Sequence, residues 1–203
     1  MSQEASSMYR WRRWTDCERA AILEQRRQRH QPAHSPLHVV SDTTTLYMIT
    51  AACFEHRAII GCTDRRMLEF CEDLAELLSE KVEQLVAWVV LPNHYHVLVE
   101  ATDVKALLKS LGRLHGRSSC YWNREDSRRG RRVWYNACET AMKSESHFYA
   151  SVNYILHNPV HHRYCRLWQD WPFSNARDYL DQMGHEKAVD RWKKYPLFDY
   201  GAS

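Results

Sequence analysis

Apolar and polar positions along the chain follow two periods, which together predict an alternation of strands and helices. Apolar residues at helical spacing predict helices over 63–82, 104–122 and 147–158. Alternating positions predict strands over 46–54, 85–91, 95–100 and 132–138. The Pro92–Asn93 turn would join the middle two strands into a hairpin, and Pro159 would stop the last helix.

This order of elements, β-α-β-β-α-β and then a helix, predicts the fold class. We expect an α+β fold: a ferredoxin-like antiparallel sheet with helices on one face. N-terminal and C-terminal helical extensions would flank it, the first containing a helix over about 16–30 with only a weak apolar stripe. The predicted parts are an N-terminal arm and helix over 1–44, a main domain over 45–162, and an extension over 163–203 that packs on the domain.

Composition narrows the class of protein. The chain has 203 residues, of which 44% are hydrophobic and 26% charged, as is ordinary for a soluble globular protein. No apolar run reaches the roughly 18 residues of a membrane span, and the N-terminus lacks an apolar signal core. The seven cysteines are odd in number and form no Cys-x-x-Cys pair, which favours reduced thiols over a disulfide framework or a zinc knuckle. We therefore expect a cytoplasmic protein with no membrane contact.

Positive charge gathers in one segment, although the net charge is only +3. The basic residues between positions 105 and 132 are Lys105, Lys109, Arg113, Arg117, Arg124, Arg128, Arg129, Arg131 and Arg132. Only Glu125 and Asp126 oppose them. This cluster predicts contact with nucleic-acid phosphates. The alternative is a solvated helix face followed by a basic loop. Several of the eight tryptophans lie among arginines, where they would stack on unpaired bases or pack in the core.

Two histidines occupy one face of a predicted strand. His94 and His96 are two residues apart, so their side chains point the same way, with Cα atoms about 6.6 Å apart. This arrangement suits two imidazoles that converge on one divalent metal ion, while Tyr95 faces away. The alternative is a pair of half-buried histidines in a sheet.

A second pair of polar side chains lies on the helix predicted over 147–158. Tyr154 and Asn158 are four residues apart and project from one stripe of that helix. Taken without the histidines, Tyr154 would be a packing residue and Asn158 a helix stop. With the histidines, the two become candidates for one active site.

These segments together resemble the HUH family of single-strand DNA nucleases, and within it the REP-associated tyrosine transposases. The resemblance covers about residues 45–180 and is carried by three motifs. They are His94-Tyr95-His96, then Tyr154-Ile155-Leu156-His157-Asn158-Pro159-Val160, and a tryptophan–serine segment over 170–179. The chain departs from the family at Tyr95, because the middle position of the family's His pair is hydrophobic and here it is tyrosine.

The resemblance implies an HUH nuclease fold and a function for each of these residues. His94, His96 and the amide oxygen of Asn158 would hold Mg²⁺ or Mn²⁺. Tyr154 would attack a phosphodiester of hairpin or palindromic single-stranded DNA and form a 5′-phosphotyrosine. A phenol needs a nearby cation or base to lose its proton, and His157 is either such a helper or a residue at the helix end. A nucleoid-associated protein is expected, as a monomer in preference to a homodimer.

Three other functions stay open at this point. The chain could be a domesticated regulator that binds hairpin DNA without cleaving it. It could be a metal phosphoesterase that activates water, or a structural domain without metal.

Overall fold

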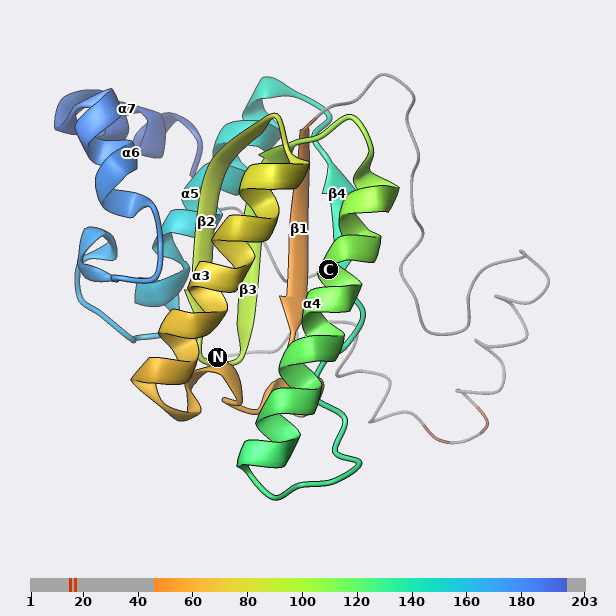
Figure 1. Cartoon of the computed structure of the whole chain (residues 1–203). Coiled ribbons are helices and arrows are strands. Elements are labelled where there is room, and N and C mark those ends of the chain that lie inside the picture. The colour runs from red at the N-terminus through yellow and green to blue at the C-terminus, as the bar shows by residue number, and fades with distance from the viewer. Residues whose placement is uncertain (1–14, 16, 18–45, 197–203) are drawn as a thin grey trace. The chain divides into compact units, whose positions relative to one another are not determined.

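The computed structural model describes residues 46–196, together with Thr15 and Cys17. The N-terminal arm and the helix predicted over 16–30 therefore fall outside the described residues. A four-stranded sheet forms the centre of the described part (Figure 1). Its strands are β1 (Leu46–Ala52), β2 (Gln84–Leu91), β3 (His94–Glu100) and β4 (Cys138–Ala141). They lie in the order β2-β3-β1-β4 with all neighbours antiparallel, which confirms the predicted ferredoxin-like sheet.

Strand register decides which side chains share a face of this sheet. Thr50 of β1 pairs with His96 of β3, and Ala52 pairs with His94. Because side chains alternate along a strand, His94, His96 and Thr50 share one face, and Tyr95 turns to the other. The predicted orientation of Tyr95 away from the histidines is therefore confirmed.

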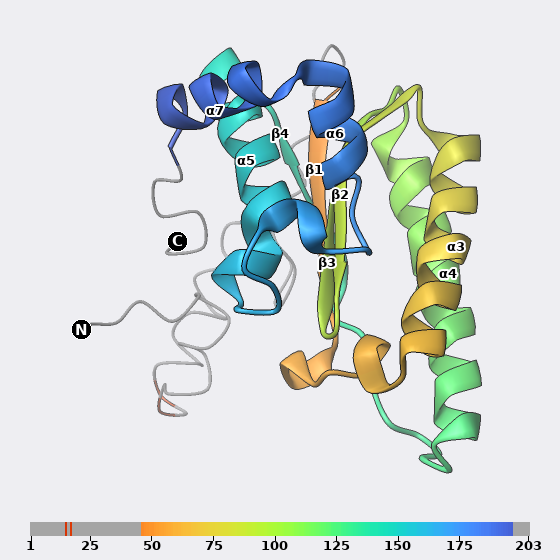
Figure 2. The same cartoon turned by 90° about the vertical axis from the view of Figure 1, so that its left-hand side faces the viewer.

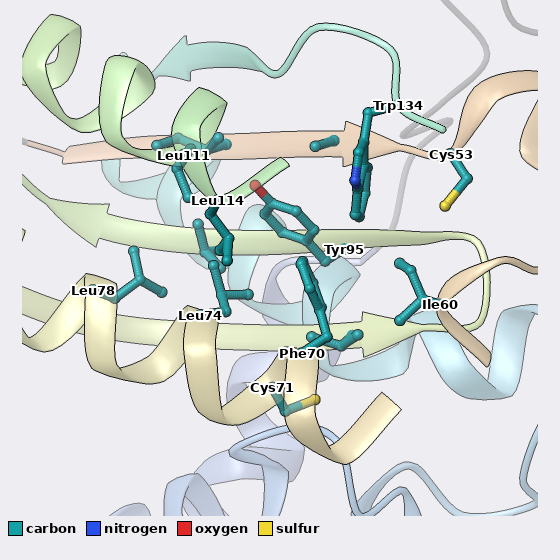
Figure 3. Close-up of a cluster of buried hydrophobic side chains, with 14 of the residues drawn as sticks. Cys53, Ile60, Phe70, Cys71, Leu74, Leu78, Tyr95, Leu111, Leu114 and Trp134 are labelled. Atoms are coloured by element: carbon teal, nitrogen blue, oxygen red, sulfur yellow. The ribbon is translucent and has the colours of Figure 1, made fainter. Parts of the chain in front are cut away.

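Two helices cover the face that holds Tyr95 (Figure 2). They are α3 (Asp64–Lys81), capped by the Thr63 hydroxyl, and α4 (Val104–Glu125), capped by the Asp103 carboxylate. Their apolar stripes enclose the larger hydrophobic core, where the rings of Tyr95, Phe70 and Trp134 meet (Figure 3). This core is the scaffold on which β3 is held.

Helix α5 (Glu145–His161) covers the opposite face and packs Val152, Ile155 and Leu156 into a second apolar cluster. The prediction that Pro159 stops this helix is wrong. Proline removes one backbone donor, yet the last turn closes around it through hydrogen bonds from the N–H of His162 to the carbonyl of Asn158 and from the N–H of Tyr164 to that of Pro159. Asn158 thereby stays inside regular helix.

The strand predicted over 132–138 is also misplaced, because β4 begins only at Cys138. Residues before it make a single isolated bridge, between Trp134 and Cys53. Val133 and Trp134 are both buried in the same core, and two consecutive inward side chains break the alternation that a regular strand requires. The segment instead crosses the end of β1 as a loop.

The segment after α5 runs along the open edge of β2. Val90 donates its N–H to the carbonyl of Phe173, while the Asn175 amide bonds the backbone of Trp88 and Val86. These bonds satisfy backbone groups of an edge strand that would otherwise stay open to pairing with another chain. The segment includes η3 (Trp168–Asp170) and continues into α6 (Ala176–Met183) and α7 (His185–Lys194). None of the described helices is long and apolar enough to cross a membrane.

Candidate active site

His94 and His96 lie side by side beneath α5. Their ring centroids are 5.0 Å apart, and the two residues are only 7% and 4% exposed. The Thr50 hydroxyl is 2.7 Å from His96 Nδ1, so a neighbouring strand fixes the orientation of that ring. The other ring nitrogen of His96, Nε2, is buried and has no hydrogen-bond partner.

The proton of His94 can be assigned from its neighbours. Asn93 donates its Nδ2 to the carbonyl of His56 at 3.1 Å, which leaves Asn93 Oδ1 as the acceptor facing His94 Nδ1 at 2.7 Å. His94 Nδ1 must then carry the proton, and its Nε2 presents a lone pair. That lone pair is 3.0 Å from Oδ1 of Asn158, which is another acceptor.

Two acceptors that face each other at this distance are stable when a cation joins them. The alternative is an Asn158 amide turned so that Nδ2 donates to His94, which would use the Nδ2 atom that is otherwise buried without a partner. In the first arrangement, His94 Nε2, His96 Nε2 and Asn158 Oδ1 form a set of two nitrogens and one oxygen. Such a set, completed by water or phosphate oxygens, fits Mn²⁺ or Mg²⁺. Within residues 46–196, no group of three or more His, Cys, Asp or Glu side chains is arranged to hold a metal ion, so an amide would have to supply the third ligand.

Both histidines are neutral near pH 7, as metal ligands must be. Burial, with a smaller contribution from the nearby His162, lowers the pKa of His94 to about 4, against the hydrogen bond to Asn158. Burial also lowers the pKa of His96 well below its usual value, with smaller contributions from His94 and His162. Their lone pairs are therefore available without competition from protons.

Tyr154 extends from α5 over the same face. Its ring centroid is 5.1 Å from that of His96, edge to face, and the residue is only partly buried. The structure thus brings together Tyr154, His94, His96 and Asn158 from two elements that are far apart in sequence. Their roles stay predictions.

His162 joins this group, although the sequence analysis did not single it out. It caps the C-terminal end of α5, and its ring centroid is 5.0 Å from that of His94. The signal was present in the sequence, because Tyr154, Asn158 and His162 recur every four residues along one stripe. His157, the proposed helper, instead packs against Trp168 and Trp192 of the C-terminal segment.

The nine basic residues predicted to bind nucleic acid do not form one surface. Five of them lie on α4, the helix on the far side of the sheet from α5 (Figure 2): Lys105, Lys109, Arg113, Arg117 and Arg124. Arg128 and Arg129 follow in the loop after α4, and Arg131 is paired with Asp126. Arg132 lies over the rings of Phe54 and Tyr135 near the end of β1.

Comparison with solved structures places this arrangement among known folds. A REP-associated tyrosine transposase bound to a REP hairpin matches the chain with a TM-score of 0.60 and 19% sequence identity. The match covers 83% of this chain and 96% of that protein. The chain has the fold of a REP-associated tyrosine transposase.

This confirms the predicted HUH fold, and an identity of 19% establishes the fold alone. A transposase candidate from Deinococcus radiodurans is also similar, at 16% identity over 61% of this chain and 97% of that one, but its TM-score of 0.37 is too low to assign a fold. No protein-family model and no curated protein matches the sequence.

Proposed function

We propose that this protein is a metal-dependent, transposase-like nuclease that cuts and rejoins single-stranded hairpin DNA through Tyr154. The observation that carries this proposal is the position of Tyr154, whose ring lies against His96, next to the buried Nε2 atoms of His94 and His96 and the amide of Asn158. The transposase fold adds support, since the matched protein is bound to a REP hairpin. We propose that hairpin or palindromic single-stranded DNA is also the substrate class of this protein.

The reaction would begin at the phenol of Tyr154. Its oxygen attacks the phosphorus of a phosphodiester as the phenolic proton leaves, and the bond from phosphorus to the 3′-oxygen breaks. The departing 3′-oxygen takes up a proton, and the DNA stays attached to Tyr154 as a 5′-phosphotyrosine. Because this linkage conserves the phosphodiester, a 3′-hydroxyl of another strand can attack it and rejoin the DNA without an energy source.

Neutral His94 and His96 and the Asn158 amide would hold Mn²⁺ or Mg²⁺, which when bound supplies Lewis-acid charge relief to the phosphate oxygens and lowers the cost of ionising a nearby phenol. Thr50 and Asn93 fix the two imidazole rings, so the lone pairs converge before any ligand arrives. The partial burial of Tyr154 limits competition from water.

The decisive experiment is detection of a covalent protein–DNA adduct on a denaturing gel, with a labelled single-stranded hairpin and Mn²⁺. Tyr154→Phe should abolish the adduct. Tyr149→Phe, which makes the same change on the same helix, should leave it intact. A regulator without activity and a water-activating phosphoesterase both predict no adduct in the unmodified protein, and cleavage that persists in Tyr154→Phe would refute the assignment.

A further inference from the structure

A group of aromatic and cationic side chains lies just beyond the candidate active site, and the chemistry above does not use it. Phe54 begins η1 (Phe54–His56), which follows β1, and its ring centroid is 5.0 Å from that of Tyr135. The guanidinium carbon of Arg132 lies 4.9 Å from the Phe54 ring and 5.4 Å from the Tyr135 ring. We call Phe54, Tyr135 and Arg132 the aromatic shelf.

The shelf adjoins the end of β1, which pairs with the strand that carries the histidines. Ala52 pairs with His94 across the strands, and its carbonyl accepts the N–H of Tyr135 at 2.9 Å. Cys53, the residue before Phe54, packs into the core that contains Tyr95, and its N–H donates to the carbonyl of Asn93 at 2.8 Å. The backbone that leads into the shelf is therefore bonded to the residue that precedes His94.

A second connection runs through the backbone of η1. Asn93, which orients His94, also donates to the carbonyl of His56. Glu55 and His56 have φ angles of 59° and 50°, a left-handed conformation that costs energy for residues with a Cβ and that clusters at functional sites. The same asparagine thus positions a proposed metal ligand and the turn that presents the shelf.

The charge of Arg132 is not used in an ion pair within the described residues, in contrast to those of Arg131 and Arg66. Arg131 pairs with Asp126, and the buried Arg66 pairs with Asp126 and Glu125. Arg132 is exposed, donates its Nε to the carbonyl of Trp134, and pairs with no carboxylate in the described part of the chain. Its charge is therefore retained at the surface, with the guanidinium close to two aromatic rings.

An exposed guanidinium over aromatic rings is suited to an unpaired nucleobase. Bases stack on aromatic faces and on guanidinium planes with little sequence preference, and the same cation attracts the adjoining phosphate. A base pair could not use the shelf in this way, because its bases are already stacked within the duplex.

We propose that the aromatic shelf binds one unpaired nucleobase of the DNA strand, immediately beside the phosphate that Tyr154 attacks. This inference rests on the proposed function, since it assigns a place to the strand that enters the same site. Of the nine basic residues predicted to bind nucleic acid, Arg132 would then be the one that contacts the DNA strand cut by Tyr154.

The test uses Tyr154→Phe protein, which should bind DNA without cutting it, and single-stranded hairpins with one 2-aminopurine moved along the unpaired flank. Stacking quenches the fluorescence of this base analogue. We expect quenching at a single position beside the cleavage site. Arg132→Gln and Tyr135→Leu, each added to this protein, should remove the quenching and weaken binding about tenfold.

Two matched controls lie away from the shelf. Arg177→Gln removes an exposed arginine whose Nε also donates to a backbone carbonyl, and Tyr121→Leu removes an exposed tyrosine on α4. Both should leave quenching and affinity unchanged. Circular dichroism and the thermal midpoint of each variant verify that it is folded.

The outcomes separate this inference from the proposed function. Quenching that depends on Arg132 and Tyr135 supports the shelf, even if the unmodified protein forms no adduct and the nuclease proposal fails. If the adduct forms at Tyr154 but both shelf variants quench and bind like the parent, the shelf is overturned. A parent protein that binds no single-stranded DNA overturns it too.

Discussion

Two buried histidines on opposite faces of the sheet differ in how their ring nitrogens are satisfied. On the face covered by α3 and α4, the Tyr95 hydroxyl is 3.0 Å from His115 Nε2, and the His115 ring stacks on Trp134. On the face covered by α5, His96 leaves a buried ring nitrogen without a partner. These histidines are similarly buried, yet one is satisfied by the protein and the other is not.

This difference separates a structural histidine from a candidate ligand. An unsatisfied buried polar atom lowers stability, so it persists where something outside the chain completes it or where function requires it. Tyr95 lies between His94 and His96 in sequence, and alternation along the strand places it on the face of His115, where its hydroxyl meets that ring. The predictions below test this division, from the largest expected effect to the smallest.

Loss of His96 should affect chemistry more than folding. His96→Ala removes a proposed ligand, and because metal charge relief is worth several kcal/mol, adduct formation should fall at least about a hundredfold. The free energy of unfolding without metal should fall by about 2 kcal/mol, because the variant loses the contact with Thr50 and leaves a cavity in place of the buried ring. Urea denaturation and the adduct assay measure the two effects, and a large loss of stability with retained activity would reverse the interpretation.

Arg66 should show the opposite pattern, because it belongs to the structural face. It is 2% exposed and bonds Asp126, Glu125 and the carbonyl of Ile59. Arg66→Met leaves two partly solvated carboxylates without their cationic partner. The free energy of unfolding should therefore fall by about 3 kcal/mol. At a temperature where the variant is folded, the adduct yield should match that of the unmodified protein. Reduced yield in a folded variant would show that the two faces are coupled.

Acid should destabilise the protein partly through His115. Burial lowers its pKa in the folded protein to about 4, from 6.5 in the unfolded chain. The unfolded chain therefore binds more protons, and stability is present above pH 6.5 and is lost as the pH falls toward 4, by up to about 3 kcal/mol.

The double variant Tyr95→Phe with His115→Leu removes both hydrogen-bond partners and this titration together. It should be within about 1.5 kcal/mol of the parent at pH 7.5 and lose less stability between pH 6.5 and 4. Urea melts at four pH values measure the slope. An unchanged slope would mean that His115 is not the titrating group.

The smallest expected effect concerns Thr50, which orients His96. Thr50→Val keeps the shape of the side chain but removes the oxygen 2.7 Å from Nδ1. Loss of an orienting partner should weaken Mn²⁺ binding about tenfold or slightly more. Calorimetric titration of Mn²⁺ measures this, with Thr140→Val on β4 as the control. Equal Mn²⁺ affinities in the two variants would show that Thr50 does not orient His96 for metal binding.

Local patterns predicted most of the fold, since α3, β2, β3 and α4 begin and end within about three residues of their expected positions. The errors occurred where tertiary packing overrides the local signal. Val133 and Trp134 are drawn together into the core, and Pro159 is held inside α5 because the following turn closes around it.

The candidate site was predictable as a set of residues but not as a geometry. Strand alternation and helical spacing pointed to His94, His96, Tyr154 and Asn158. Nothing local could reveal that Asn93 fixes the His94 proton, since that inference needs the carbonyl of His56, 37 residues earlier in the chain. The shelf was hidden for the same reason: Phe54 and Tyr135 meet only when β1 and the loop before β4 lie side by side.

The most direct test of the central claim is to locate the bond between protein and DNA. Adduct formed with a single-stranded hairpin and Mn²⁺ would be digested with trypsin and nuclease, and the peptides sequenced by mass spectrometry. A nucleotide phosphate on the hydroxyl of Tyr154, formed only when the metal is present, is the predicted result. A link at another residue, or strand cleavage with no covalent product, would contradict the account.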